Sequence, residues 1–373
     1  MQLKPIAEQV VVVMGASSGI GRATALRFAE HGAKVVVASR GEPGLRSLVA
    51  EIDQAGGTAT SVVADVTDPA QVQAVADHAA QTYGGIDTWV QMAGVLLVAG
   101  FDDTTPAEFA RVLHVNLLGQ VHGAKAALPH LRSGGGGAFI SMSSMGAKRG
   151  IPLQTAYCSS KHGIDGFLEA LRVELQRDRV PVSVTQIMPG TINTPLFDNA
   201  RTKMGVKPVA PPPAYPARVV ADAIVHAAQH PVRDLVVGGS AKTLITTEKF
   251  APRLVDALLR RIGYEAHDTG EAKPADALDN LDAPITGHTT VEGSVGGVTL
   301  QHSAYTWLAM HRPISTATRT LTSPVAAFVR RHSGRATAPI LAAVRNASRP
   351  TAAARSEQAG SASGSHLAAP TRS

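Results

Sequence analysis

The sequence contains a single cysteine, Cys158, among 373 residues, and aromatic residues make up only 4% of it. One cysteine excludes a disulfide framework and any zinc site built from cysteines. No stretch approaches the roughly 18 apolar residues that a membrane-spanning helix needs, and the N-terminal residues lack the basic and apolar pattern of a secretory signal. We therefore expect a cytoplasmic protein that does not cross a membrane.

The formal net charge of +6 is concentrated at one end of the chain. Residues 300–373 contain nine arginines and one acid, Glu357, which gives them a net of +8 and leaves −2 for the rest. Two interpretations of this basic tail stay open: a loosely ordered appendage, and an interfacial segment on an anionic membrane surface. A nucleic-acid partner is not expected, because no recognition module or interleaved aromatic residues accompany the arginines.

Short β-branched runs alternate with longer helical patterns between residues 9 and 240. The runs are nearly continuously apolar, as in parallel strands that are covered on both faces. Helix starts are marked at Asp68-Pro69 and at Thr105-Pro106-Ala107-Glu108, which has the spacing of a capping box. The pattern predicts an α/β fold with a doubly wound parallel sheet of about seven strands. The candidate strands are Gln9–Val13, Lys34–Ala38, Ala59–Ala64, Ile86–Val90, Ala138–Met142, Val182–Ile187 and Asp234–Val237.

The chain divides into three parts on this basis. Residues 1–240 are predicted to form a Rossmann-type catalytic domain that binds a dinucleotide, and residues 241–347 a C-terminal extension with helices and a linker. Within that extension, 242–264 predict one amphipathic helix bent at Pro252, and 265–300 an irregular linker. Residues 348–373 are rich in alanine, serine and glycine, which predicts a disordered tail.

The first candidate strand leads directly into a glycine-rich turn, Gly15-Ala16-Ser17-Ser18-Gly19-Ile20-Gly21. Glycines at this spacing allow a sharp turn, a close approach to a pyrophosphate and a helix whose first amides face the anion. The second strand ends at Ser39-Arg40, where an acid would repel a 2′-phosphate and a guanidinium can bind it. We therefore expect NADP(H) as the preferred cofactor, with NAD(H) possible. Asp65, at the end of the third strand, is placed to accept from the adenine amino group.

Tyr157 and Lys161 are four residues apart, so they share one face of a predicted helix. A free tyrosine is a poor base at neutral pH, and a neighbouring ammonium is expected to lower the pKa of its hydroxyl. Ser144 follows a strand thirteen residues upstream and can hydrogen-bond a substrate oxygen that gains negative charge. Together the three residues suit proton transfer to or from an alcohol.

These motifs resemble the short-chain dehydrogenase/reductase (SDR) family over residues ~7–240, and they occur in the order and at the spacing usual in that family. The resemblance implies an oxidoreductase that interconverts a carbonyl and an alcohol by hydride transfer. It makes Tyr157 the general acid/base, Lys161 the residue that lowers its pKa and holds the nicotinamide ribose, Ser144 the residue that orients the substrate, and Asn116 the support of a water in the proton relay. Ser144 and Tyr157 are also the predicted substrate-binding residues. The predicted cofactor-binding residues are Gly15, Ser17, Ser18, Gly19, Ile20, Gly21, Ser39, Arg40, Asp65, Val66, Ala93, Gly94, Tyr157, Lys161, Pro189, Gly190, Ile192 and Thr194.

The sequence departs from the family at Gln91-Met92, where two asparagines are usual, so side-chain hydrogen bonds that stabilise the sheet there are expected to be lost or altered. Residues 195–216 are expected to form a partly mobile lid over an apolar pocket, with Leu153 and Gln154 beside it. No metal is expected, because the histidines at 114, 122, 130 and 162 lack paired ligands. Relatives commonly form dimers or tetramers, so a homo-oligomer is possible.

Two alternative functions stay open. One is a cofactor-binding sensor or scaffold that keeps the fold without turnover. The other is a reductase that acts on a lipid-like substrate at a membrane surface, with the basic tail as its contact. The identity of the small-molecule carbonyl or alcohol substrate and the direction of the reaction do not follow from the sequence.

Overall fold

The computed structural model describes residues 1–274, 276–285, 289–295 and 298–311. Its centre is a seven-stranded sheet in the order β12-β7-β6-β4-β1-β2-β3, in which every neighbouring pair is parallel. The order reverses direction between β1 and β4, which is where doubly wound sheets bind their ligands. The strands are β1 (Val10–Met14), β2 (Lys34–Ser39), β3 (Thr58–Val63), β4 (Thr88–Gln91), β6 (Gly137–Met142), β7 (Val182–Pro189) and β12 (Asp234–Val237).

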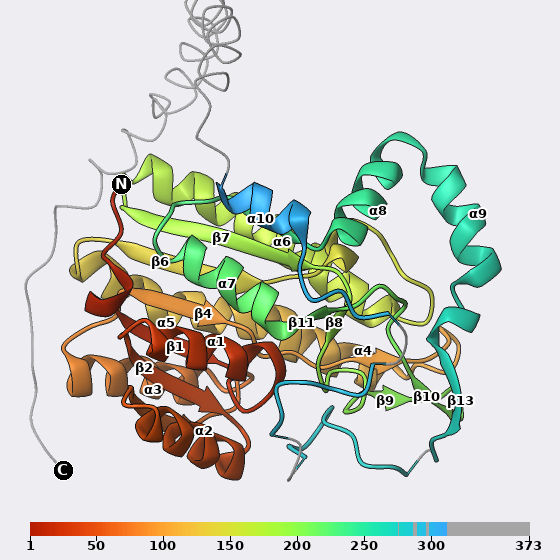
Figure 1. Ribbon diagram of the computed structural model, residues 1–373, viewed down its shortest axis with the longest axis horizontal. Coiled ribbons are helices and arrows are strands. Elements are labelled where there is room, and N and C mark those ends of the chain that lie inside the picture. The colour runs from red at the N-terminus through yellow and green to blue at the C-terminus, as the bar shows by residue number, and fades with distance from the viewer. Residues whose placement is uncertain (275, 286–288, 296–297, 312–373) are drawn as a thin grey trace, which may run out of the picture. The chain divides into compact units, whose positions relative to one another are not determined.

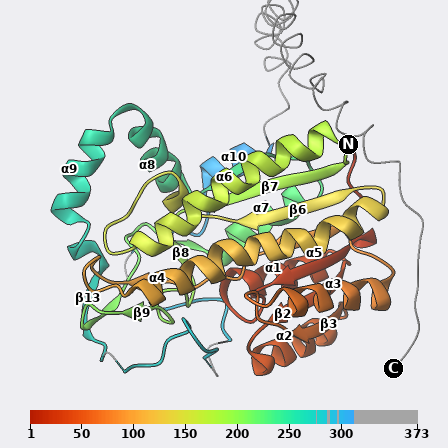
Figure 2. The same ribbon diagram turned by 180° about the vertical axis from the view of Figure 1, so that it is seen from behind.

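Helices cover both faces of this sheet. On the face turned toward the viewer in Figure 1, α1 and α7 pack side by side. On the opposite face, seen in Figure 2, α3 packs on α5 and α4 on α6. The helices of the sheet domain are α1 (Gly19–Glu30), α2 (Glu42–Gln54), α3 (Pro69–Tyr83), α4 (Pro106–Leu113), α5 (Gly119–Ser133), α6 (Thr155–Arg177) and α7 (Ala217–Ala227). Two separate apolar clusters fill the space on either side of the sheet.

The sheet confirms the predicted fold class, and all seven predicted strands lie within two residues of the observed ones. Both predicted helix starts are also present. The side chain of Asp68 accepts from the amides of Ala70 and Gln71 at the start of α3. Thr105 and Glu108 form a complete capping box at the start of α4. Both signals involve residues that are close in sequence, so they can be recognised without knowing any tertiary contact.

The C-terminal extension differs from its prediction. In place of one bent helix over 242–264, there are two, α8 (Gly239–Phe250) and α9 (Pro252–Ile262), because Pro252 occupies the first turn of a new helix and cannot continue the old one. The predicted linker contains η4 (Glu265–His267) and the strand β13 (Asp268–Ala272), and α10 (Ala304–His311) follows it. The predictions for residues beyond 311 lie outside the described part of the chain.

Residues 1–311 form one compact unit, so the extension up to α10 packs with the sheet domain. Three two-stranded sheets connect distant segments at the carboxyl end of the main sheet. These pairs are β5 (Leu97–Val98) with β9 (Arg201–Thr202), β8 (Ile192–Asn193) with β11 (Tyr215–Pro216), and β10 (Val206–Pro208) with β13. Within the described residues, none of the helices has the length and apolar character needed to cross a bilayer.

Candidate active site

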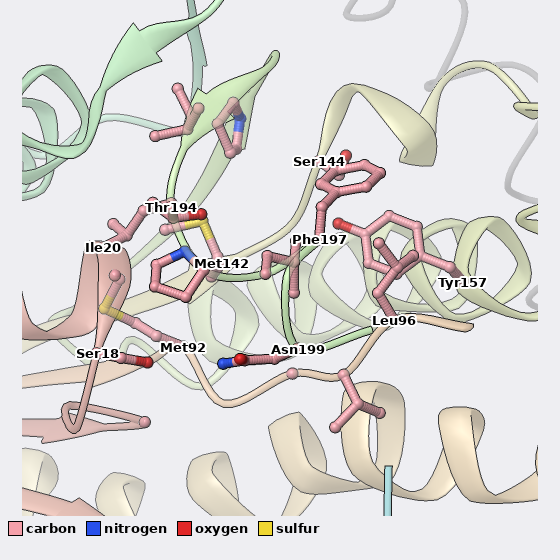
Figure 3. A pocket seen from close by; sticks show the side chains of 18 of the residues that line it. Ser18, Ile20, Met92, Leu96, Met142, Ser144, Tyr157, Thr194, Phe197 and Asn199 are labelled. Carbon is pink, nitrogen blue, oxygen red and sulfur yellow. The ribbon is translucent and has the colours of Figure 1, made fainter. Parts of the chain in front are cut away.

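A cavity of about 520 Å³ lies at the carboxyl ends of the central strands. Figure 3 shows Ser18 and Ile20 of the glycine turn on one side of it and Ser144 and Tyr157 on the other. Most of the predicted site residues line this cavity, but Asp65 and Asn116 do not. The predicted residues in its wall are Gly15, Ser17, Ser18, Gly19, Ile20, Gly21, Ser39, Arg40, Val66, Ala93, Gly94, Ser144, Tyr157, Lys161, Pro189, Gly190, Ile192 and Thr194.

The glycine turn requires glycine at two positions for different reasons. Gly15 has a φ of +85°, and a Cβ there would lie 2.7 Å from the amide nitrogen of Ala93. A Cβ on Gly21 would overlap the carbonyl oxygen of Gly15. The first strand, the turn and the loop after β4 can therefore pack this closely only without side chains. The backbone at the start of α1 is therefore not covered by side chains of these glycines.

Tyr157 and Ser144 lie near each other at the far end of the cavity. Ser144 caps the short helix η3 (Met145–Ala147), where its Oγ accepts from the amide of Gly146 at 3.0 Å. Tyr157 and Lys161 lie one turn apart on α6, and the Lys161 amine is 5.4 Å from the centre of the Tyr157 ring. The same amine donates to the Met142 carbonyl oxygen at 3.1 Å.

The pKa of Tyr157 differs from the expectation drawn from the sequence. Burial raises the pKa of Tyr157 to about 12, although the hydrogen bond with Ser144 acts in the opposite direction. Burial also lowers the pKa of the Lys161 amine to about 8. The reason for the difference is that Lys161 directs its amine at the Met142 carbonyl, and the loss of solvation outweighs its charge. The phenol is thus firmly protonated at neutral pH.

Asn116 lies outside the cavity wall and joins two elements. It sits in a short π-helical segment, η2 (His114–Leu118), between α4 and α5, a geometry often found at functional sites. Its Oδ1 accepts from the amide of Val95 at 2.8 Å, and its Nδ2 donates to the Val95 carbonyl oxygen and to the Ser160 hydroxyl. Asn116 therefore fixes the loop after β4 against α6, next to Tyr157.

The end of β2 carries Ser39 and Arg40, as predicted, and both line the cavity. Arg40 is held by the chain itself: its guanidinium donates to the carbonyl oxygens of Asn280 at 2.6 Å and Asp282 at 3.1 Å. Burial lowers the pKa of Arg40, against the favourable charge of Asp65. The Asp65 carboxylate accepts from the amide and hydroxyl of Thr67 and so faces away from the cavity.

Gln91, the unusual residue at the end of β4, has its own hydrogen bonds. The fully buried Gln91 donates to the Gly119 carbonyl oxygen at 3.0 Å and accepts from the Trp89 indole at 2.8 Å. Gln120 in turn donates to the Gln91 carbonyl oxygen. The side-chain hydrogen bonds at this position are thus altered and not lost, because Gln91 reaches Trp89 and Gly119.

The predicted lid, residues 195–216, lines the cavity with Pro195, Leu196 and Phe197 near its start and Ala210, Pro211 and Pro212 near its end. Between them, Lys203 pairs with Glu108 of α4 at 2.7 Å, and Lys207 pairs with Asp198 inside the lid itself at 3.1 Å. Of the two residues expected beside the lid, Gln154 lines the cavity, whereas Leu153 packs in the apolar cluster behind it.

The extension supplies cavity residues that the sequence did not indicate. They are Leu244, Leu258, Leu259, His267, Asn280, Pro284, Ile285 and Thr289. His267 is almost fully buried, stacks on Phe197 and lies 3.3 Å from the Gln154 amide nitrogen. Burial lowers its pKa, against the opposing effect of the hydrogen bond with the Val209 carbonyl oxygen. In the sequence, His267 stands out only as a single histidine within a polar segment. No motif spacing identifies it as a site residue.

The residues present fit a dinucleotide on structural grounds. The hydroxyls of Ser39 and Ser143 are buried in the cavity wall without a hydrogen-bond partner among the described residues. Buried polar atoms without partners are costly, and a ligand that supplies hydroxyl or phosphate groups removes that cost. The bare glycine turn at the start of α1 offers the close backbone approach that a pyrophosphate needs.

Comparison with known proteins identifies the family. The family model described as "short chain dehydrogenase" matches residues 9–205. The oxidoreductase YxnA of Bacillus subtilis is 38% identical over 320 residues, which are 85% of this chain and 89% of YxnA. The versicolorin reductase stcU of Emericella nidulans is 35% identical over 51% of this chain and 71% of its own length.

Two solved structures share the fold. A short-chain dehydrogenase/reductase from Burkholderia phymatum in complex with NAD has a TM-score of 0.61 at 23% identity and covers 68% of this chain and 96% of its own. A short-chain type dehydrogenase/reductase from Mycobacterium marinum has a TM-score of 0.56 at 29% identity, with 62% and 95% covered. The matched family model and the length shared with YxnA leave one conclusion: the chain belongs to the short-chain dehydrogenase family and is an NAD(P)-dependent oxidoreductase.

Proposed function

We propose that the protein uses NADP(H) to interconvert a carbonyl and an alcohol, and that carbonyl reduction is its favoured direction. The observation that carries the proposal is that Ser144 and Tyr157 line one cavity together with the glycine turn. When bound, the nicotinamide supplies the hydride. The protein has to hold the substrate oxygen, supply a proton to it and exclude water.

Tyr157 is proposed to be the proton donor. A pKa of about 12 keeps its hydroxyl protonated at neutral pH. A carbonyl oxygen that gains negative charge during reduction is a much stronger base than a phenolate, so the proton moves toward it. Ser144 hydrogen-bonds the same oxygen and stabilises the growing charge. The alcohol oxidation would instead need a phenolate, which burial disfavours.

Lys161 and Asn116 are proposed to support this step from either side. The Lys161 ammonium lies 5.4 Å from the phenol ring, where its charge stabilises the phenolate that remains after proton transfer. Asn116 holds the loop of Ala93 and Gly94 by its two bonds to Val95. A role for Asn116 in supporting a water stays a prediction from the resemblance.

The preference for NADP(H) rests on the end of β2. Arg40 lines the cavity there, and Ser39 leaves a buried hydroxyl without a partner among the described residues. A guanidinium binds a phosphate with two parallel hydrogen bonds, whereas an acid at Ser39 would repel it. Two of the guanidinium nitrogens already donate to backbone carbonyl oxygens, which orients the group without satisfying all five of its donors.

The test is a panel of aldehydes and ketones with NADPH or NADH deuterated at the transferable position. We expect NADPH consumption with at least one member and one deuterium on the carbinol carbon of its product. A panel without turnover, or a product without deuterium, would contradict the proposal. The first of these results would favour the non-catalytic sensor or scaffold.

A second candidate is the same reaction on an apolar substrate at an anionic membrane surface, and α9 favours it. Its side chains Leu254, Leu258 and Ile262, with Phe250 before it, are 45–78% exposed, and Leu258 also lines the cavity. Figures 1 and 2 both show α8 and α9 standing out from the body of the molecule. An apolar helix face that rims a cavity gives a lipid-like substrate a direct path.

The charges of this hairpin suit anionic lipid better than a second copy of the chain. Its two acids, Glu248 and Asp256, are paired with Arg149 of the body. None of the ion pairs in the described chain involves its cations Lys242, Lys249, Arg253, Arg260 and Arg261. Two copies would therefore repel, whereas phosphate headgroups would attract.

Sedimentation with phosphatidylglycerol vesicles tests this second candidate. We expect the intact protein to sediment with them at low salt and Leu254→Glu to stay in solution. Val173→Glu is the control, because Val173 is equally exposed on α6, far from the cavity. A protein that ignores the vesicles, or two variants that behave alike, would refute the membrane contact.

A further inference from the structure

A segment of the extension contributes residues to the wall of the cavity. We call its described residues, 279–285 and 289–295, the strap. Asn280, Pro284, Ile285 and Thr289 of the strap line the cavity. The family model ends at residue 205, so the strap lies outside the region that defines the family. The strap touches the proposed cofactor site at both of its ends.

At the adenosine end, the strap is fixed by charges and by one apolar anchor. Leu281 is fully buried in the apolar cluster that includes Val66 and Val95. Arg201, from the lid, donates to the carboxylates of Asp279 and Asp282 at 2.8 Å each. The same stretch supplies the two carbonyl oxygens that receive the Arg40 guanidinium. The guanidinium therefore connects the end of β2 to the strap.

At the opposite end, the strap reaches the two turns that flank the pyrophosphate and nicotinamide positions. The carbonyl oxygen of Thr290 accepts from the amide of Gly19, the first residue of α1, at 2.9 Å. Gly293 passes so close to Thr194 that a Cβ would overlap the Thr194 carbonyl oxygen. The amide of Val295 donates to the Asn193 side chain at 3.2 Å. The strap thus spans the groove from Arg40 to Thr194.

One strap residue that lines the cavity, Asn280, also has a polar side-chain atom that makes no hydrogen bond among the described residues. The side-chain oxygen of Asn280 is buried and has no hydrogen-bond partner among the described residues. The Ser39 hydroxyl, which also lines the cavity, is likewise without a partner. A buried acceptor of this kind favours a ligand with hydrogen-bond donors. The ribose hydroxyls and the adenine amino group of a dinucleotide are such donors.

We propose that the strap completes the cofactor site: Asn280 binds the adenosine half directly, and the dinucleotide exchanges only when the strap detaches. The inference rests on the proposed cofactor binding. The cavity remains beside the strap, but the Thr290 carbonyl oxygen holds the Gly19 amide, so a pyrophosphate that binds this amide has to break that contact. Local opening of such a segment then limits how fast the cofactor leaves.

Leu281→Ala tests the enclosure, and Leu278→Ala is its matched control, because Leu278 is three residues earlier and 78% exposed. The readout is NADPH dissociation from the full-length protein, followed by its fluorescence in a stopped-flow chase with excess NADP⁺. We expect Leu281→Ala to dissociate roughly tenfold faster and to bind more weakly, as expected when a fully buried leucine anchor is lost, and Leu278→Ala to match the wild type. Equal rates in all three proteins, or tighter binding by Leu281→Ala, would overturn the proposal.

Two further measurements keep the test independent of folding defects. Asn280→Leu keeps the size of the side chain but removes the acceptor, and should raise the Kd for NADPH about fivefold, the cost of one hydrogen bond, with an unchanged melting temperature.

Hydrogen exchange of residues 279–285 should slow when NADPH binds. Faster exchange there would mean that the cofactor displaces the strap. If the wild type binds neither dinucleotide, the proposed function is contradicted. If the wild type binds normally and the strap variants bind and release NADPH as it does, only this inference is contradicted.

Discussion

The sequence shows the spacing of Tyr157 and Lys161. It does not show the pKa values of their side chains. Their separation places both on one face of α6, and the cavity wall contains both. The pKa values depend on how completely the fold removes water, and the sequence does not state that. Burial raises the pKa of Tyr157 to about 12 and lowers that of Lys161 to about 8. The pair is therefore better suited to give a proton than to take one.

The pH dependence of reduction should reflect Lys161. Below its pKa of about 8 the amine is charged and can stabilise the phenolate, and above that pH the charge is lost. Because Tyr157 stays protonated throughout, kcat/KM for reduction should be level below pH 8 and fall above it. Lys161→Arg should remove this fall, since a guanidinium keeps its charge. A level wild-type profile up to pH 9.5 would contradict this role of Lys161.

Arg40 should govern the choice between the two dinucleotides. Arg40→Asp replaces a phosphate ligand by an acid that suits a free 2′-hydroxyl, so the ratio of kcat/KM for NADPH to that for NADH should fall at least about tenfold, the value of one charged hydrogen bond. Arg46→Asp is the control, because Arg46 lies on the exposed side of α2 and pairs only with Glu42 among the described residues. An unchanged ratio in Arg40→Asp would mean that another group reads the phosphate.

At the scale of elements, the strands and helix starts of the sheet domain were predictable because their signals are local. Apolar runs, the Asp68 cap and the Thr105 capping box each act within a few residues. The break at Ala251 was less evident, since a proline both bends a helix and starts one. The hydrogen bonds of Gln91 reach α5 and could not be foreseen, because they depend on how closely that helix approaches β4.

The close packing of α5 on β4 yields a stability prediction. A methyl group on Gly123 would overlap the side-chain oxygen of Gln91 and press on the Trp89 indole. Gly123→Ala should therefore lower the free energy of unfolding by about 1–3 kcal/mol. Gly166→Ala on α6 meets no atom within 4 Å and should be neutral or stabilising by up to about 1 kcal/mol. Urea titration of both variants checks the difference, and a Gly123→Ala as stable as Gly166→Ala would contradict the packing.

At the scale of the whole molecule, the site itself was only partly predictable. The glycine turn, Ser144, Tyr157 and Lys161 line one cavity, as the motifs indicated. The contributions of His267 and Asn280 were missed, because residues 265–300 show no periodicity and their place depends on contacts made more than a hundred residues away. The α8–α9 hairpin was predicted as one helix, but its place at the cavity was not. Residues 265–300 contact a cavity formed by distant parts of the chain, and such contacts produce no local periodicity in the sequence.

If the extension is part of one folded unit, it should unfold together with the sheet. The two tryptophans report on the two parts: Trp89 is fully buried in β4, and Trp307 is half-exposed on α10. In Trp307→Phe and Trp89→Phe, the remaining fluorescence should give the same thermal midpoint once each variant's stability is accounted for by circular dichroism. A Trp307 signal that changes well before the loss of secondary structure would show that the extension unfolds separately.

The central claim is that Tyr157 gives its proton to a substrate oxygen beside a bound nicotinamide, and one comparison tests it most directly. Tyr157→Phe removes the hydroxyl and little else, so turnover with the best carbonyl substrate should fall by about 10²–10⁴-fold. NADPH binding by the same variant, measured by fluorescence titration, should stay within about threefold of the wild type, since the glycine turn is untouched. A Tyr157→Phe protein that turns over within tenfold of the wild type would contradict the account.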